Sequence, residues 1–132
     1  MSVFIDTSAF VCVLDADDPR HKNARTAWES LIERDEPLVT TNYIVVETSA
    51  VLQRMCGVEA VRIFMTELLP VVSIEWVDAT VHHAGVAAFL TAQKRSLSLV
   101  DCISFDTMRR LGVSTAFAYD RHFKEHGHTM IP

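Results

Sequence analysis

The sequence predicts an α/β fold, a three-layer α/β/α sandwich around a central, mainly parallel sheet of four or five strands. Short apolar segments alternate with longer segments in which apolar residues recur at helical spacing. This alternation runs along the whole length, and it is typical of parallel strands joined by helices that cover both faces. With 132 residues, 49% of them hydrophobic, the chain suits one compact domain over residues 1–132.

The first half of the chain contains two predicted strands and four predicted helices. Val3-Phe4-Ile5 and Leu38-Val39-Thr40 are short apolar runs of the kind that form buried strands. Asp18 is a favoured N-cap, and Pro19 suits the first position of the helix that Pro37 ends. We expect the helices at residues 7–14, from Pro19 to before Pro37, at 43–56 with a cap at Thr41 or Asn42 and an end at Gly57, and at 58–69 before Pro70.

The second half repeats the same alternation. Strands are expected at residues 71–77 and 115–118, with a short edge strand near 129–131. Asp78 caps a predicted helix that carries a narrow stripe of small residues, including Ala84 and Ala88. Ser98 begins another helix, which runs to Leu111 and ends at Gly112.

Composition limits the classes of function. The net charge is −5, from 17 acidic and 12 basic residues, which does not fit a protein held on nucleic acid by a broad basic surface. No apolar stretch approaches the roughly 20 residues that span a bilayer, and the N-terminal segment has no basic region typical of a signal peptide. Cys12, Cys56 and Cys102 form no CxxC pair, so we expect buried, reduced thiols in a cytoplasmic protein.

Two acidic residues follow predicted strands. Asp6 comes directly after the first strand, and Asp120 lies just beyond the strand at 115–118. In an open parallel sheet, ligands bind outside the carboxyl ends of the strands, so both carboxylates are expected at one edge. The alternative is that each residue caps the helix that follows it, because Asp is a favoured N-cap.

Two further acidic residues lie on predicted apolar helix faces. The helical neighbours of Glu47 include Tyr43, Ile44 and Val51, so its carboxylate points away from water and requires a cation, a proton or a partner. Asp101 shares a stripe with Phe105, but Ser98-Leu99-Val100-Asp101 also resembles a capping box, which would occupy part of the carboxylate. An ordinary ion pair for Glu47 and a purely structural Asp101 remain open.

Convergence of these carboxylates would define a metal site. Like charges about 4 Å apart repel by roughly 4 kcal/mol at an effective dielectric near 20, so such a cluster requires cations. Oxygen ligands without His or Cys favour Mg²⁺ or Mn²⁺. These ions stabilise the charge of a phosphodiester and lower the pKa of an attacking water. The predicted activity is therefore metal-dependent hydrolysis of phosphodiester bonds, with Asp6, Glu47, Asp101 and Asp120 as metal and catalytic residues.

Four short motifs, spread over nearly the whole chain, resemble the PIN-domain family, and specifically the ribonuclease toxins of VapBC-type toxin–antitoxin pairs. They are Phe4-Ile5-Asp6-Thr7-Ser8, Tyr43-Ile44-Val45-Val46-Glu47, Leu97-Ser98-Leu99-Val100-Asp101 and Tyr119-Asp120-Arg121-His122-Phe123. The resemblance implies a PIN-like fold and a Mg²⁺- or Mn²⁺-dependent endoribonuclease that cleaves RNA. It also implies a homodimer and a cognate antitoxin protein that silences the enzyme.

The resemblance also assigns roles to individual positions. Asp6, Glu47, Asp101 and Asp120 match the family's acidic metal site, and Ser8 matches a hydroxyl that orients a ligand or phosphate. The family often has Thr or Ser two residues before the last acid, where this chain has Ala118. The loss of that hydroxyl would weaken the support of the last acid.

Two other functions compete with this one. A non-catalytic PIN-like binding module would keep the fold without the chemistry. A phosphohydrolase with Asp6 as nucleophile is disfavoured, because such enzymes typically carry a second Asp two residues later, where this chain has Ser8.

His122, His126 and His128 are interpreted as solvated residues rather than a zinc site. Asp106 is expected to pair with Arg110, one helical turn away.

Overall fold

The computed structural model describes residues 1–132 and contains a five-stranded sheet in the order β3-β2-β1-β4-β5. Every neighbouring pair of strands is parallel, which confirms the predicted α/β class and shows that the sheet is fully parallel. The strands are β1 (Val3–Ile5), β2 (Leu38–Thr41), β3 (Ser73–Glu75), β4 (Thr115–Phe117) and β5 (Thr129–Ile131).

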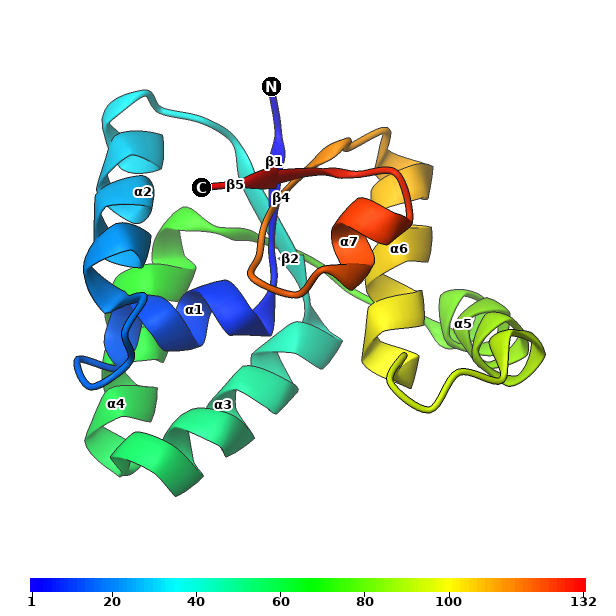
Figure 1. Cartoon of the computed structure of the whole chain (residues 1–132), viewed down its shortest axis with the longest axis horizontal. Coiled ribbons are helices and arrows are strands. Elements are labelled where there is room, and N and C mark those ends of the chain that lie inside the picture. Colours follow the sequence, from blue (N-terminus) through cyan, green and yellow to red (C-terminus); the bar gives the residue numbers. More distant parts are fainter.

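Helices cover both faces of this sheet. Figure 1 shows α1 and α2 on one side and α6 on the other, with α5 outside α6. The helices are α1 (Thr7–Leu14), α2 (His21–Glu33), α3 (Asn42–Cys56), α4 (Val58–Ile63), α5 (Ala79–Ala92), α6 (Leu99–Leu111) and α7 (His122–Glu125). A π-helical turn (Phe64–Leu68) and a 3₁₀ turn (Leu69–Val71) follow α4.

The structure corrects three predicted boundaries. Helix α2 begins at His21 rather than Pro19, because the Asp18 carboxylate accepts the Arg20 N–H at 2.8 Å within a turn and does not cap the helix. The helix predicted at 58–69 becomes π-helical from Phe64, and Pro70 has no N–H with which to continue it. Strand β3 covers residues 73–75 instead of 71–77, and the short helix α7 was not predicted.

The centre of the sheet forms the hydrophobic core. All three residues of β1 are fully buried, as is Phe117 of the neighbouring β4. Phe10 of α1 contacts Phe64 edge-on, with ring centroids 4.9 Å apart, and so joins the first helix to the end of α4. Complete burial of a central strand fits a parallel sheet covered on both faces. It also places the carboxyl ends of β1 and β4 side by side.

The predicted helix caps position the helices around this core. Thr41 accepts the Ile44 N–H and so begins α3, and Asp78 accepts the Val81 N–H at the start of α5. Helix α6 ends at Gly112, whose φ of 68° lies in the left-handed region that glycine adopts without strain. These ends fall within one residue of their predicted positions.

Two further sequence expectations concern membrane-spanning segments and the cysteines. No helix of the structure is long and apolar enough to cross a membrane. All three cysteines are free thiols, as expected, but Cys56 is exposed and only Cys12 and Cys102 are buried. Cys56 is the last residue of α3, where the helix end reaches the surface.

Candidate active site

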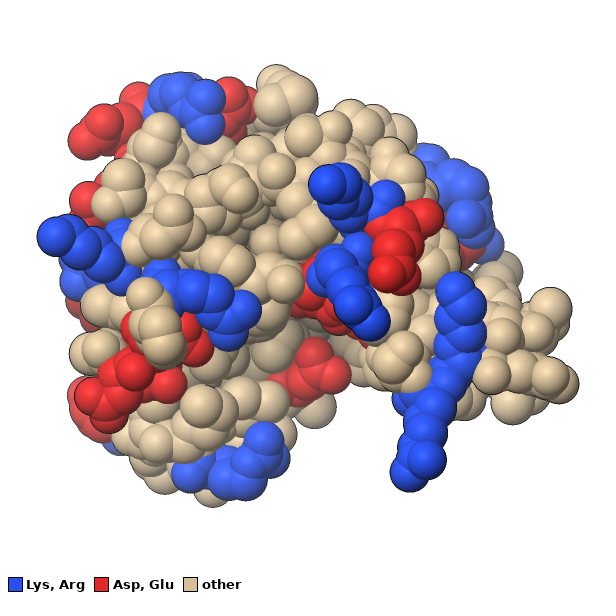
Figure 2. All heavy atoms as spheres, in the orientation of Figure 1, with Lys and Arg blue, Asp and Glu red and all other residues tan.

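The carboxyl ends of the central strands meet at one edge of the sheet, beside a cleft of about 400 Å³. All four acidic residues selected from the sequence line this cleft: Asp6, Glu47, Asp101 and Asp120. Figure 2 shows acidic atoms in a hollow near the middle of this face, with basic side chains on either side. The cleft lies where open parallel sheets bind ligands.

Asp6 is the most deeply buried of the four, with 5% of its surface exposed. It caps α1, and its Oδ2 atom accepts hydrogen bonds from the Ser8 N–H at 3.2 Å and the Ser8 hydroxyl at 2.6 Å. The pKa of Asp6 is raised to about 6, chiefly because burial disfavours the charged form. The two bonds from Ser8 act in the opposite direction, while the nearby charges of Asp101 and Glu47 add to the rise.

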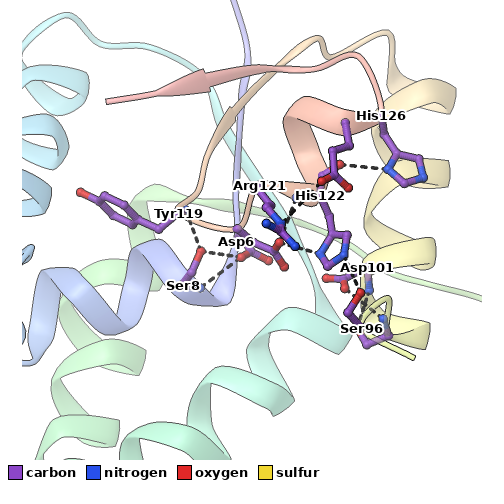
Figure 3. Close-up of polar contacts among 11 residues, drawn as sticks. Asp6, Ser8, Ser96, Asp101, Tyr119, Arg121, His122 and His126 are labelled. Carbon is purple, nitrogen blue, oxygen red and sulfur yellow. Dashed lines mark hydrogen bonds and ion pairs between the residues drawn. The ribbon is translucent and has the colours of Figure 1, made fainter. Parts of the chain in front are cut away.

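Ser8 joins Asp6 to the end of β4. Its hydroxyl donates to Asp6 and accepts the Tyr119 N–H at 2.9 Å, as Figure 3 shows. The sequence resemblance suggested that Ser8 orients a ligand or phosphate. In the structure both contacts of the hydroxyl are made within the protein, so its effect on a ligand passes through the orientation of Asp6.

Glu47 is brought to the same cleft as Asp6 by α3, and its neighbour Thr48 fixes that helix. Thr48 is fully buried and donates a hydrogen bond to the Thr7 hydroxyl at 3.0 Å, which ties the middle of α3 to the start of α1. The Glu47 side chain is half-buried and makes no hydrogen bond or ion pair with the protein. Both of its carboxylate oxygens are therefore free to bind a ligand in the cleft.

Asp101 has the capping role that the sequence left open. Its Oδ2 atom accepts the Ser98 N–H at 3.0 Å, and the Ser98 hydroxyl accepts the Asp101 N–H at 3.0 Å. Burial raises the pKa of Asp101, and the charge of Asp120 contributes to the rise. The capping box uses one carboxylate oxygen, so Oδ1 has no partner in the protein.

Asp120 lies in the loop after β4, and one of its oxygens is also held. Oδ1 accepts the backbone N–H of His122 at 2.9 Å and contacts the Nδ1 atom of the same residue at 2.7 Å. Oδ2 makes no hydrogen bond within the protein. The site thus follows one pattern: each Asp is anchored through one oxygen and keeps the other free, and Glu47 keeps both.

This pattern fits a hard divalent cation. Each carboxylate can offer an oxygen without losing the contact that holds it, and oxygen ligands are those that Mg²⁺ and Mn²⁺ prefer. One ligand atom each of Asp101, Asp120 and His122 lies within 4.8 Å of the others, which forms the tightest part of the cluster. Asp6 and Glu47 line the same cleft outside that group.

The environment of His122 differs from the sequence interpretation of the C-terminal histidines. His122 was expected to be solvated, but it is 8% exposed and contacts both Asp120 and Ser96. His126 is exposed, as expected, although its ring stacks on Phe105, and His128 is half-buried and also stacks on Phe105. The sequence signal for His122 was its position two residues after Asp120, where a turn brings its ring back to the carboxylate. The predicted ion pair of Asp106 is confirmed, at 2.6 Å from Arg110.

Arg20 places a positive charge at the wall of the cleft. Its guanidinium pairs with Asp18 at 3.2 Å and lies 4.8 Å from the centre of the Tyr119 ring, and both Arg20 and Asp18 line the cleft. Arg121 is highly exposed near the same edge and pairs with Glu125 at 3.6 Å. Arg20 and Arg121 thus place positive charge beside the acidic cleft, although the net charge of the chain is −5.

The fold and the cleft define a class: an α/β protein whose parallel sheet carries a carboxylate site at its strand ends. The comparisons with known proteins place it within that class. The PIN-domain family model matches residues 3–128, so the chain belongs to the PIN-domain family, as its motifs predicted. Nucleases of this family generally use divalent metal ions.

Individual relatives agree with this assignment. The chain is 32% identical over 126 residues to the 23S rRNA-specific endonuclease VapC20 of Mycobacterium tuberculosis, covering 95% of this chain and 94% of the relative. A crystal structure of that protein, described as a sarcin–ricin loop cleaving toxin, matches with a TM-score of 0.85 at 31% identity, covering 96% of each chain. The FitAcB structure from Neisseria gonorrhoeae matches with a TM-score of 0.70 at 15% identity, over 100% of this chain and 97% of that one, and supports the fold alone.

Proposed function

We propose that this chain is a metal-dependent endoribonuclease of the VapC type, with residues 1–132 forming one PIN-like nuclease domain. The observation that carries the proposal is the arrangement of the four acids around one cleft, each with at least one oxygen free of protein contacts. Relatives over nearly the whole chain bear the name of an rRNA-specific endonuclease. We assign Asp6, Glu47, Asp101 and Asp120 as the catalytic metal ligands.

The residues of the cleft prepare it for phosphodiester hydrolysis. When bound, Mg²⁺ or Mn²⁺ would supply the positive charge that stabilises the phosphate and lowers the pKa of an attacking water. The protein holds Asp6 through Ser8, Asp101 through its capping box and Asp120 through His122. Carboxylates held in this way would need little reorganisation to bind an ion and a phosphate, which would lower the entropic barrier of the reaction.

RNA is the proposed substrate, and structured ribosomal RNA is the first class to test. The relatives are named as a 23S rRNA-specific endonuclease and a sarcin–ricin loop cleaving toxin, and these substrates are stated for those proteins. In this chain the negative net charge disfavours binding along extended RNA, because affinity for a nucleic acid backbone depends on many basic contacts. A local rim that includes Arg20 suits a short exposed loop better than a long duplex.

A cleavage assay on total RNA tests the proposal. The purified chain should cut RNA in the presence of Mg²⁺ or Mn²⁺ and lose this activity with a chelator. Asp6→Asn and Glu47→Gln should each abolish cleavage while thermal unfolding stays cooperative, and sequencing of the cut ends would identify the RNA. Glu59→Gln is the matched control, because Glu59 is an exposed residue of α4 paired with Arg62 at 3.1 Å. Undiminished cleavage by Asp6→Asn or Glu47→Gln would refute the assignment.

The RNA assay, together with an assay on small phosphate esters, separates the two alternatives. A non-catalytic module would not cut RNA, and no activity of it would require Mn²⁺. This outcome is possible even though the cleft has free carboxylate oxygens. A phosphohydrolase with Asp6 as nucleophile would act on small phosphate esters without RNA. In this structure Asp6 Oδ2 is held by Ser8, the residue that replaces the second Asp of such enzymes.

We further propose a cognate antitoxin in the same cytoplasmic compartment. A groove of about 430 Å³ between α1, α2 and the end of α4 has an apolar floor that includes Trp28, Ile32 and Ile63. Its rim carries three glutamates and one arginine: Glu29, Glu33, Glu67 and Arg25. An amphipathic helix with a basic face would match both the floor and the charge of the rim.

We also propose a homodimer that uses α5. Gly85 is the only buried residue of this mostly apolar helix, and Leu90 is 63% exposed. Ala84 and Ala88, the small residues noted in the sequence, allow a second helix to approach closely. A monomeric mass by light scattering at working concentration would count against this proposal, and Ala88→Glu should dissociate the dimer if it is correct.

A further inference from the structure

The Asp120 carboxylate is held almost entirely by one residue. His122 supplies both contacts to Oδ1, from its backbone N–H at 2.9 Å and from its ring Nδ1 at 2.7 Å. No other side chain bonds to Asp120, and residue 118 is an alanine without a hydroxyl. The orientation of the free Oδ2 oxygen is therefore set by His122, through its backbone N–H and its ring together.

The ring is itself fixed from its far side. Ser96, in the loop before α6, places its hydroxyl 3.2 Å from Nε2 of His122. His122 is buried, with 8% of its surface exposed, whereas Asp120 keeps about a third of its side chain accessible. Figure 3 shows the imidazole between Ser96 and the loop that carries Asp120. A buried ring with a partner on each nitrogen has little freedom to turn.

The chemistry of these contacts assigns the proton on the neutral ring. A carboxylate accepts hydrogen bonds and donates none, so the nitrogen that faces Asp120, Nδ1, must carry the hydrogen. Nε2 is then an acceptor, which the Ser96 hydroxyl satisfies by donating. The three groups form one directed chain of hydrogen bonds, from Ser96 through His122 to Asp120.

We propose that His122 is a positioning residue, which holds Asp120 so that its free oxygen faces the metal-binding part of the cleft. This inference rests on the proposed function, because it takes Asp120 as a metal ligand. One ligand atom each of Asp101, Asp120 and His122 lies within 4.8 Å of the others, so rotation of the ring would move a carboxylate next to Asp101. Groups that orient metal ligands contribute about 10- to 100-fold to metal affinity or activity in known sites.

Two isosteric substitutions separate the two ring nitrogens. The amide nitrogen of His122→Asn lies about where Nδ1 does and keeps the donor to Asp120, whereas that of His122→Gln lies about where Nε2 does and loses it. Titration calorimetry with Mn²⁺ should show about tenfold or greater weakening for His122→Gln and near wild-type affinity for His122→Asn. The control is His83→Gln, which changes an exposed histidine of α5 outside the cleft and should bind Mn²⁺ like the wild type.

Combination with Asp120→Asn shows whether the effect passes through Asp120. If His122 acts through that carboxylate, His122→Gln should weaken Mn²⁺ binding no further in the Asp120→Asn background. Equal Mn²⁺ affinity of the wild type and His122→Gln would overturn the inference, as would additive effects in this cycle. If the wild type itself binds no Mn²⁺, the proposed metal-dependent function fails instead.

A measurement on the metal-free protein is independent of both variants. Long-range ¹H–¹⁵N NMR correlations should show the neutral His122 ring with its hydrogen on Nδ1, and Asp120→Ala should release that preference. The Nε2–H form in the wild type would contradict the proposed chain of hydrogen bonds, even if every variant failed to fold.

Discussion

Thr48 donates a hydrogen bond to Thr7 at 3.0 Å in the protein interior, and each threonine directly follows an acidic residue of the cleft. The bond therefore sets the spacing between Asp6, at the start of α1, and Glu47, in the middle of α3. Thr48 is fully buried and does not line the cleft, whereas Thr7 lies at the cleft wall next to Asp6. A site assembled from distant segments depends on such contacts between its supporting elements.

Removal of this bond should loosen the site. Thr48→Val keeps the side-chain shape but leaves the buried Thr7 hydroxyl without its partner, at a cost of about 1–3 kcal/mol in unfolding free energy. RNA cleavage should fall by about tenfold or more, because small displacements of reacting groups are expensive. In the double variant Thr7→Val, Thr48→Val no buried hydroxyl lacks a partner, so stability should recover while cleavage stays low. Thr26→Val, on the exposed side of α2, is the control.

Ser8 should affect both the carboxylate and the loop after β4. Ser8→Ala removes the donor to Asp6 and the acceptor for the Tyr119 N–H, so we expect a loss of about 1–2 kcal/mol in unfolding free energy. Mn²⁺ affinity should fall by about tenfold, as for other groups that orient metal ligands. Ser49→Ala removes a hydroxyl that bonds within α3 and should leave Mn²⁺ affinity unchanged. Wild-type affinity in Ser8→Ala would show that Asp6 needs no such support.

The two roles of Asp101 can be separated by substitution. Asp101→Asn keeps an oxygen to accept the Ser98 N–H but loses the charge, so stability should be retained and metal-dependent cleavage lost. Ser98→Ala removes the N-cap and should cost about 1 kcal/mol in unfolding free energy while cleavage persists. The prediction fails if both variants lose cleavage to the same extent, because Asp101 would then act through the helix start alone.

How far the sequence predicted this site depends on the range of the contacts. Asp6 and Asp120 were found from their places after strands, and Glu47 from its apolar helical neighbours, because these signals are local. The spacing of Ser98 and Asp101 predicted the capping box that holds one Asp101 oxygen. The anchoring of Asp6 by the Ser8 hydroxyl and of Asp120 by His122 depends on hydrogen-bond geometry that no spacing encodes. His122 was misjudged because α7 has four residues, too few to show helical periodicity. Its contact with Ser96 also joins residues 26 positions apart in the sequence.

The contact between α5 and α6 gives a prediction about stability alone. Gly85 lies so close to α6 that an added Cβ would be 2.2 Å from Cδ1 of the fully buried Ile103. Gly85→Ala should therefore destabilise the fold by about 1–3 kcal/mol, despite the better helix propensity of alanine. Ile103→Val removes the Cδ1 atom and should recover part of the loss in the double variant. Denaturant unfolding measures both effects, and a more stable Gly85→Ala would show that the helices separate easily.

The raised pKa of Asp6 makes stability depend on pH. An ordinary Asp titrates at 3.8, whereas Asp6 in the folded chain titrates at about 6. Between these values the folded state holds the proton more tightly than the unfolded state does, so stability is lost as the pH rises through this window. At about 1.4 kcal/mol per pKa unit, the loss without metal is on the order of 3 kcal/mol above pH 6.

Asp6→Asn isolates this effect, because asparagine carries no charge at any pH in the window. Denaturant unfolding of the metal-free wild type and variant from about pH 4 to 8 should show an advantage for Asp6→Asn that grows with pH and levels off above about 6. Mn²⁺ should then stabilise the wild type far more than the variant, because the ion binds the folded state through the carboxylate that the variant lacks. A stability difference that stays constant with pH would mean that the Asp6 charge is relieved within the protein, and that a cation is not needed to hold the site together.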